Sequence, residues 1–186
     1  LWERVREYFQ DGGRFGWQIE YSVEPRPMGT GGAALWAQPL WGQQAVLANG
    51  DTFLQEDWRQ LLSAHRRQDL PATMALVRQA DCGRFGKVRV KGGRVVGFAE
   101  KAGRGGGWIN AGVCVLDRRA LDGFRRGEAF SLERDVFARL VGRIAAYCCR
   151  GAFADIGTVE SLAEFRGRYA GRVGAKGREN GLGEPL

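Results

Sequence analysis

The chain has 186 residues, of which 44% are hydrophobic and 26% charged, and this composition is typical of one globular domain with a buried core. No apolar run approaches the roughly 18 residues that cross a bilayer, which excludes a membrane-spanning helix. The formal net charge is +7, but most basic residues are scattered arginines in runs no longer than a pair, so we expect neither nucleic acid nor a membrane as partner. A small anionic substrate such as a nucleotide fits this charge.

The first third of the chain alternates between helical and strand patterns. Apolar residues recur at helical spacing over residues 1–10, and strict alternation over residues 17–23 predicts a strand. A loop rich in Pro and Gly at residues 24–32 leads into an apolar helix over residues 33–41, and a short buried strand follows at residues 45–48.

The rest of the chain continues this alternation. The expected elements are a helix over residues 56–67, a strand over 73–77, hairpin strands over 87–90, 94–99 and 109–116, a helix over 131–141 capped by Ser131, and a helix from 158 onward. We therefore predict one α/β layered domain with a largely parallel sheet over residues 1–170. The glycine-rich residues 171–186 are expected to form a frayed tail.

Cysteine and histidine patterns argue against a zinc site. The four cysteines have no C-x-x-C spacing, and we expect them to be free, mostly buried thiols of a protein in a reducing, cytoplasmic compartment. The single histidine, His65, lies in a polar stretch at the expected end of a helix, where we expect it to be solvated or stabilised by the helix dipole.

Two aspartates at strand-to-loop transitions are candidate metal ligands. Asp51 follows the buried strand at 45–48, and Asp155 precedes the last helix. Ligands of α/β sheets bind beyond the carboxyl ends of the strands, and Mg²⁺ takes one or two carboxylates together with water and phosphate oxygens. The alternative is that each aspartate only caps the turn or helix that follows it.

The loop before the apolar helix is a candidate nucleotide site. Gly29, Thr30 and the glycines after them open a helix, so backbone N–H groups there could face an anion or a flat ring. Glu24 lies just upstream, and a carboxylate can accept two parallel hydrogen bonds from the donor edge of guanine. Glu24 could equally be an exposed acid before a proline.

Two later motifs suit a sugar phosphate. Glu100 and Lys101 offer a hydroxyl acceptor and a cation for a phosphate, although such a pair is also common on surfaces. Asn110 begins a strand of small residues that could approach a sugar ring closely, or could mark a bulge or turn.

The order of these motifs is more informative than any one of them. It resembles that of the sugar-1-phosphate nucleotidyltransferases over about residues 2–169, with the greatest likeness to bacterial D-glycero-α-D-manno-heptose 1-phosphate and mannose-1-phosphate guanylyltransferases. The stretches that carry the resemblance are Glu24–Ala33, Asn49–Phe53, Phe85–Val88, Phe98–Lys101, Trp108–Val113 and Asp155–Thr158.

The resemblance implies a three-layer α/β/α fold of the GT-A type and the synthesis of an NDP-sugar and pyrophosphate from an NTP and a sugar 1-phosphate, for surface glycans such as lipopolysaccharide. It implies catalytic roles for Asp51, Lys101 and Asp155, with both aspartates as Mg²⁺ ligands. The implied nucleotide-binding residues are Glu24, Pro27, Gly29, Thr30 and Asp51, and the implied sugar-phosphate residues are Gly86, Glu100, Lys101 and Asn110.

One part of the family pattern does not occur in this sequence. The family opens with a glycine-rich loop, Leu-Ala-Gly-Gly-x-Gly-Thr-Arg, and a Pro-Lys-Pro segment, and we therefore expect the chain to lack the first βα unit and to be inactive as it stands. A shortened pseudoenzyme, a non-catalytic nucleotide-sugar binding module and a thymidylyl- or uridylyltransferase remain alternatives. An open sheet edge would leave room for a homo-oligomer.

Overall fold

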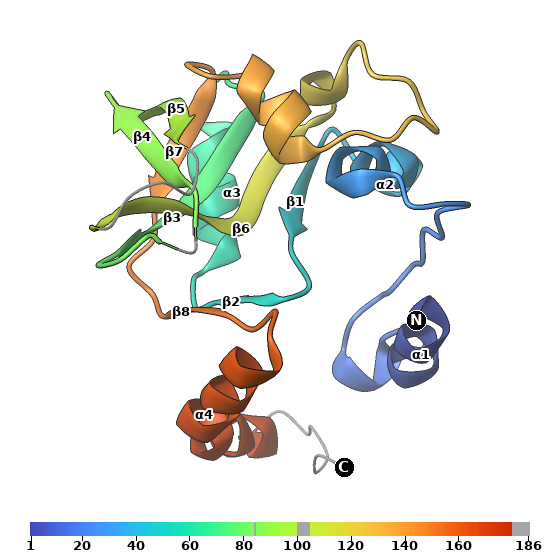
Figure 1. Cartoon of the computed structure of the whole chain (residues 1–186). Coiled ribbons are helices and arrows are strands. Elements are labelled where there is room, and N and C mark those ends of the chain that lie inside the picture. The colour runs from blue at the N-terminus through green and yellow to red at the C-terminus, as the bar shows by residue number, and fades with distance from the viewer. Residues whose placement is uncertain (84, 100–104, 180–186) are drawn as a thin grey trace.

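The computed structural model describes residues 1–83, 85–99 and 105–179 (Figure 1). The α-helices are α1 (Trp2–Phe9), α2 (Gly29–Ala37), α3 (Trp58–Arg66) and α4 (Val159–Glu179). The strands are β1 (Gln44–Ala48), β2 (Thr52–Leu54), β3 (Ala72–Gln79), β4 (Lys87–Lys91), β5 (Arg94–Ala99), β6 (Gly107–Asp117), β7 (Ile144–Cys148) and β8 (Phe153–Asp155). Short 3₁₀ turns span Gly13–Phe15, Gln38–Leu40 and Arg118–Leu121, and a π-helical turn, η4, spans Leu132–Phe137. None of the helices in these ranges is long and apolar enough to cross a membrane.

Six strands form the main sheet, in the order β1-β6-β3-β7-β5-β4. β3 pairs with β7 in parallel, and β1 shares their direction because both β1 and β3 are antiparallel to the long β6 between them. β4 and β5 form the expected antiparallel hairpin. β2 and β8 form a separate two-stranded sheet below the main one (Figure 1).

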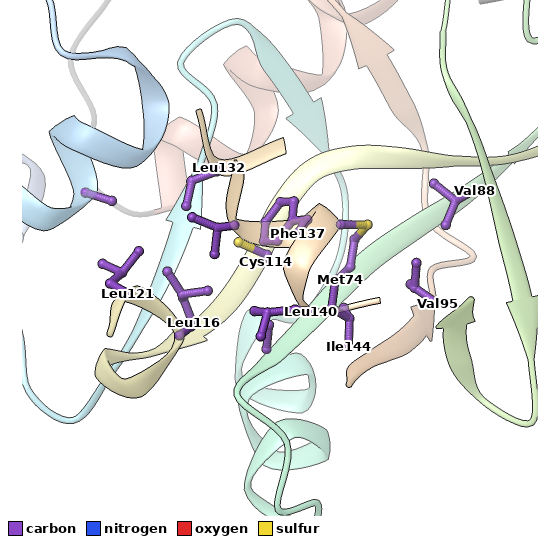
Figure 2. Close-up of a cluster of buried hydrophobic side chains, with 14 of the residues drawn as sticks. Met74, Val88, Val95, Cys114, Leu116, Leu121, Leu132, Phe137, Leu140 and Ile144 are labelled. Atoms are coloured by element: carbon purple, nitrogen blue, oxygen red, sulfur yellow. The ribbon is translucent and has the colours of Figure 1, made fainter. Parts of the chain in front are cut away.

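The core lies on both faces of the main sheet, which gives the three expected layers. On one face Met74 and Cys114 pack with Phe137 of η4 and with residues of α2, and Figure 2 shows Phe137 directly against Cys114. On the other face Ala75 packs in a second cluster with Leu61 of α3. β3 is thus apolar on both faces, and this explains why its sequence is a continuous apolar run without alternation. The α/β prediction is confirmed.

The strand predicted over residues 17–23 is absent. This segment pairs with no strand among the described residues and is tethered at single points, where the Trp36 Nε1–H donates to the Val23 carbonyl at 3.0 Å and the Ile19 N–H donates to the Asp11 carbonyl at 2.8 Å. Trp17 remains 63% exposed. Alternation alone indicates an extended chain with two faces, whereas a strand also needs a hydrogen-bonded neighbour.

The C-terminal prediction also needs correction. The chain is helical through Glu179 within α4, so residues 171–179 of the tail that was predicted to be frayed form helix.

His65 lies in the last turn of α3, at the helix end where it was predicted, but it is buried, so of the two predicted states the solvated one is wrong. It lies on the inner face of α3, four residues after Leu61, and is 1% exposed. Its Nε2 lies 2.8 Å from Asp117 Oδ1 and its Nδ1 lies 2.9 Å from Thr73 Oγ1, so both ring nitrogens are hydrogen-bonded. A buried polar ring with two partners is stable at the helix–sheet interface, and the polar sequence around His65 hid the inward direction of this one side chain.

All four cysteines are free thiols and three of them are buried, which confirms this part of the prediction for the cysteines.

Candidate active site

The two candidate metal ligands, Asp51 and Asp155, lie close together at one end of the small sheet that β2 and β8 form. β2 and β8 pair antiparallel with Thr52 opposite Asp155, and the Ile156 N–H donates to the Asp51 carbonyl at 2.9 Å. A Cβ atom placed on Gly157 would lie 3.1 Å from Asp155 Oδ1 and 3.1 Å from Asp51 Oδ2. The pairing therefore brings together two carboxylates that are 104 positions apart in the sequence.

This pair suits a hard divalent cation. Asp155 Oδ1 also accepts a hydrogen bond from the Gly157 N–H at 2.9 Å, which fixes the carboxylate beside the gap that glycine leaves. No cluster of three His, Cys, Asp or Glu side chains capable of holding a metal occurs in the described ranges. Two carboxylates match a Mg²⁺ site that takes its other oxygens from water and phosphate, and they do not match a site made by protein alone.

A cavity of about 800 Å³ opens between the carboxyl end of β1 and the start of α2. It brings together three predicted site residues, Thr30, Asp51 and Asn110, in a volume suited to a small-molecule ligand. The lining side chains that carry charge are the carboxylates of Asp51 and Glu133, and no Lys or Arg joins them among the described residues. A phosphate-bearing ligand here needs cations from elsewhere.

Asn110 and Gly112 shape one wall of this cavity through a bulge in β6. Met74 pairs with Cys114 and Leu76 pairs with Asn110, so three residues of β6 face one residue of β3. Gly112 has φ 70°, and its N–H donates to Asn110 Oδ1 at 3.0 Å. The bulge considered as an alternative for this motif is therefore present, and it lies at the cavity, as bulges beside functional sites often do.

The opposite wall is the start of α2. Glu24 Oε2 accepts a hydrogen bond from the Met28 N–H at 2.9 Å, so this carboxylate holds the turn that precedes the helix. The Gly31 and Gly32 N–H groups donate to the Phe130 carbonyl at 3.0 and 3.2 Å. We predicted that N–H groups after Thr30 could face a ligand. For Gly31 and Gly32 this was wrong, because both N–H groups donate to the same protein carbonyl.

The remaining predicted residues lie away from the cavity lining or outside the described residues. Glu24, Pro27 and Gly29 lie just before Thr30, and Gly86 lies at the start of β4 beside the Ala99 carbonyl. Glu100 and Lys101 are outside the described residues and directly follow β5.

Glu133 lines the cavity and was not predicted. Its Oε2 accepts hydrogen bonds from the hydroxyls of Thr30 at 2.9 Å and Ser131 at 2.8 Å. Its charge adds to burial, the larger cause, in raising the pKa of the Cys114 thiol to about 12. The sequence identified Ser131 as an N-cap, and this is confirmed because its hydroxyl accepts from the Arg134 N–H at 3.2 Å. The sequence held no signal that η4 packs against α2.

Comparison with known proteins agrees with the family that the order of the motifs resembles. Residues 2–171 match the family described as nucleotidyl transferase. The mannose-1-phosphate guanylyltransferase of Mycobacterium tuberculosis is 38% identical over 161 residues, which cover 83% of this chain and 45% of that protein. The D-glycero-alpha-D-manno-heptose 1-phosphate guanylyltransferase of Campylobacter jejuni is 32% identical over 168 residues, which cover 88% of this chain and 73% of that protein. The chain thus spans less than half of the first relative and about three quarters of the second.

Solved structures share the fold. HddC from Yersinia pseudotuberculosis, complexed with GMP-PN, superposes with a TM-score of 0.78 at 22% identity, over 90% of this chain and 74% of that one. A putative glucose-1-phosphate thymidylyltransferase from Bacillus anthracis, in complex with a sucrose, gives a TM-score of 0.75 at 20% identity, over 89% of this chain and 71% of that one.

Proposed function

Because this chain belongs to the nucleotidyl transferase family, we propose that its protein makes a nucleotide sugar from an NTP and a sugar 1-phosphate. An oxygen of the sugar phosphate forms a bond to the α-phosphorus of the NTP, and the bond from that phosphorus to the β-phosphate oxygen breaks, which releases pyrophosphate. Such a transfer requires alignment of the reacting groups and neutralisation of charge more than covalent chemistry by the protein.

The observation that carries this proposal is the juxtaposition of Asp155 with Asp51, which lines the cavity together with Thr30 and Asn110. The two carboxylates come from strand ends far apart in the sequence, and an oxygen of each lies close to Gly157. Asp155 caps its own turn through the Gly157 N–H, but a local cap of this kind does not require the Asp51 carboxylate to lie beside the same glycine.

We propose that Asp51 and Asp155 hold Mg²⁺. The donor set fits, since both are hard oxygen ligands that lie close together. When bound, the cation would supply positive charge against the phosphate oxygens as the transfer proceeds. The acidic cavity supports this role, because Asp51 and Glu133 alone would repel a triphosphate.

The remaining roles follow from position along the chain. Lys101, two positions after the end of β5, is proposed to hold the phosphate of the sugar, with Glu100, Gly86 and Asn110 around the sugar ring. The turn from Glu24 to Thr30, with Pro27 and Gly29, is proposed to read the base. The names of the relatives support guanine as that base and mannose 1-phosphate or a heptose 1-phosphate as the acceptor.

The test is a pyrophosphate-release assay on the intact protein rather than on this chain alone, with each of GTP, UTP and dTTP, paired with mannose 1-phosphate, heptose 1-phosphate or glucose 1-phosphate, with and without Mg²⁺. We expect product with GTP and one of the first two sugars, and none when EDTA is present. Calorimetry on the same protein gives the second measurement. Binding of a GDP-sugar with no turnover under any pairing would contradict the proposal and identify a non-catalytic binding module, and neither binding nor turnover would also contradict it.

A further inference from the structure

The start of α2 is docked on a segment that lies about 100 residues later in the chain. We name Phe130–Glu133 the docking segment. The Phe130 carbonyl accepts the Gly31 and Gly32 N–H groups, and the Phe130 N–H donates to the Met28 carbonyl at 3.0 Å. Figure 1 shows α2 alongside η4, which begins within this segment. The backbone of the turn before α2 therefore takes its position from the docking segment.

Close approach of the two backbones requires glycine at this place. Gly29 has φ 69°, and a Cβ on it would lie 2.6 Å from the Phe130 carbonyl oxygen. Phe130 is itself anchored, because its ring stacks on that of Phe124 with centroids 4.1 Å apart. The docking segment is thus a fixed support for the turn, and the glycines of α2 serve this contact.

One side chain connects this support to the cavity. The Thr30 hydroxyl donates to Glu133 Oε2 at 2.9 Å and accepts the Leu132 N–H at 2.9 Å, so Thr30 is held from both sides by the docking segment. Ser131 donates to the same carboxylate oxygen at 2.8 Å, which orients Glu133 from its own element. Thr30, Leu132 and Glu133 all line the cavity.

We infer that Glu133 is a positioning residue of the nucleotide site: it fixes Thr30, and with it the turn proposed to read the base. This inference rests on the proposed function. A carboxylate that accepts two hydroxyl donors forms charge-assisted hydrogen bonds, which are about twice as strong as neutral ones, and an adjustable turn is thereby held in one geometry. Loss of Glu133 should weaken nucleotide binding equally in the ground state and the transition state, because the residue does not touch the reacting phosphorus.

The experiment compares Glu133→Ala, Thr30→Val and the double variant in the full protein. Each single variant should raise the KM for GTP about tenfold, leave kcat within about twofold and lower the preference for GTP over UTP. The double variant should be no worse than either single one, because both changes break the same contact. Glu133→Gln, which keeps an oxygen acceptor for Thr30, should recover most of the base preference. Glu128→Ala, an exposed glutamate nearby, is the matched control and should behave as wild type.

The outcomes separate the two proposals. If the wild type turns over GTP and the Glu133 and Thr30 variants keep its base preference and KM, the role of Glu133 is overturned and the proposed function stands. Additive effects in the double variant would also overturn it, since the two residues would then act independently. If the wild type neither binds nor turns over any nucleotide, the proposed function falls and the role of Glu133 falls with it. If the variants only lose stability, as thermal unfolding would measure, the active fraction and hence kcat should fall while the base preference stays unchanged. This outcome would also overturn the role of Glu133.

Discussion

The two walls of the candidate cavity use their polar groups in opposite ways. At the strand ends, backbone groups are paired in ladders, the side chains of Asp51 and Asn110 line the cavity, and Asp155 lies close to Asp51. At the start of α2, the backbone N–H groups of Gly31 and Gly32 are consumed by the Phe130 carbonyl. At the first wall, strand pairing therefore fixes the backbone and polar side chains line the cavity. At the second wall, the position of the backbone itself depends on contacts with residues far away in the sequence. Substitutions should separate these two tasks.

The largest expected effect lies at the first wall. Asp51→Asn and Asp155→Asn should each lower kcat/KM about a thousandfold, since loss of a metal ligand removes several kcal/mol of stabilisation and each ~1.4 kcal/mol is a factor of ten. Stability should not fall, because two carboxylates that both lie close to Gly157 repel each other when no cation is bound. Turnover assays and thermal unfolding of the same preparations measure both quantities.

Asp122→Asn is the matched control, because Asp122 is exposed and distant from the cavity lining. It should leave both turnover and the melting temperature unchanged. A large drop in the melting temperature of Asp51→Asn, with activity retained by the folded fraction, would mean that this aspartate is only a structural cap.

The second wall should show the reverse pattern. A Cβ on Gly32 would lie 2.6 Å from the Glu128 carbonyl oxygen and 2.7 Å from Met28 Cβ, so Gly32→Ala forces the backbones apart. Overpacking of this kind costs about 1–3 kcal/mol of unfolding free energy. Gly42→Ala is the control, since nothing lies within 4 Å of the position that its Cβ would take. Denaturant unfolding of the two variants should separate them by at least ~1 kcal/mol, and equal stabilities would mean that α2 and the docking segment can move apart freely.

The two walls also differ in how well the sequence predicts them. Asp51 and Asp155 could be proposed as site residues because Asp51 follows a strand with a local apolar pattern and Asp155 lies where a strand gives way to a loop, and the carboxyl ends of strands are where ligands bind. Glu133 could not be found, because its contact with Thr30 spans 103 positions and depends on packing between α2 and η4. The sequence marked the glycines after Thr30 as important but predicted a ligand as the partner of their N–H groups. It could not do better, because a sequence does not show whether a glycine allows close approach of a ligand or of another backbone segment.

The same limit explains the errors in the fold. The strands β3 and β6 were predicted closely because their apolar runs exceed what a loop would carry. Residues 17–23 alternate regularly but find no neighbouring strand in the described structure. His65 lies in a polar stretch although its own position faces inward on α3. A local sequence pattern predicts an element correctly when the tertiary neighbours that the element needs are present. For these two segments, the neighbours come from residues far away in the sequence.

The smallest expected effect concerns Cys114, which lies on β6 beside Phe137 (Figure 2). Burial, and to a lesser degree the charge of Glu133, raises the pKa of this thiol from 9.0 to about 12. Between those values the unfolded chain releases the thiol proton and the folded protein retains it, so the folded state binds more protons and its stability falls as the pH rises. The contribution is fully present below about pH 9 and is lost at up to ~1.4 kcal/mol per pH unit above it.

Cys114→Ala should therefore be less stable than wild type at pH 7, because it leaves a cavity, and this difference should shrink between pH 9 and pH 11 in denaturant unfolding. A difference that stayed constant over this range would mean that the thiol ionises freely in the folded protein, and hence that the packing of η4 over β6 is open to water.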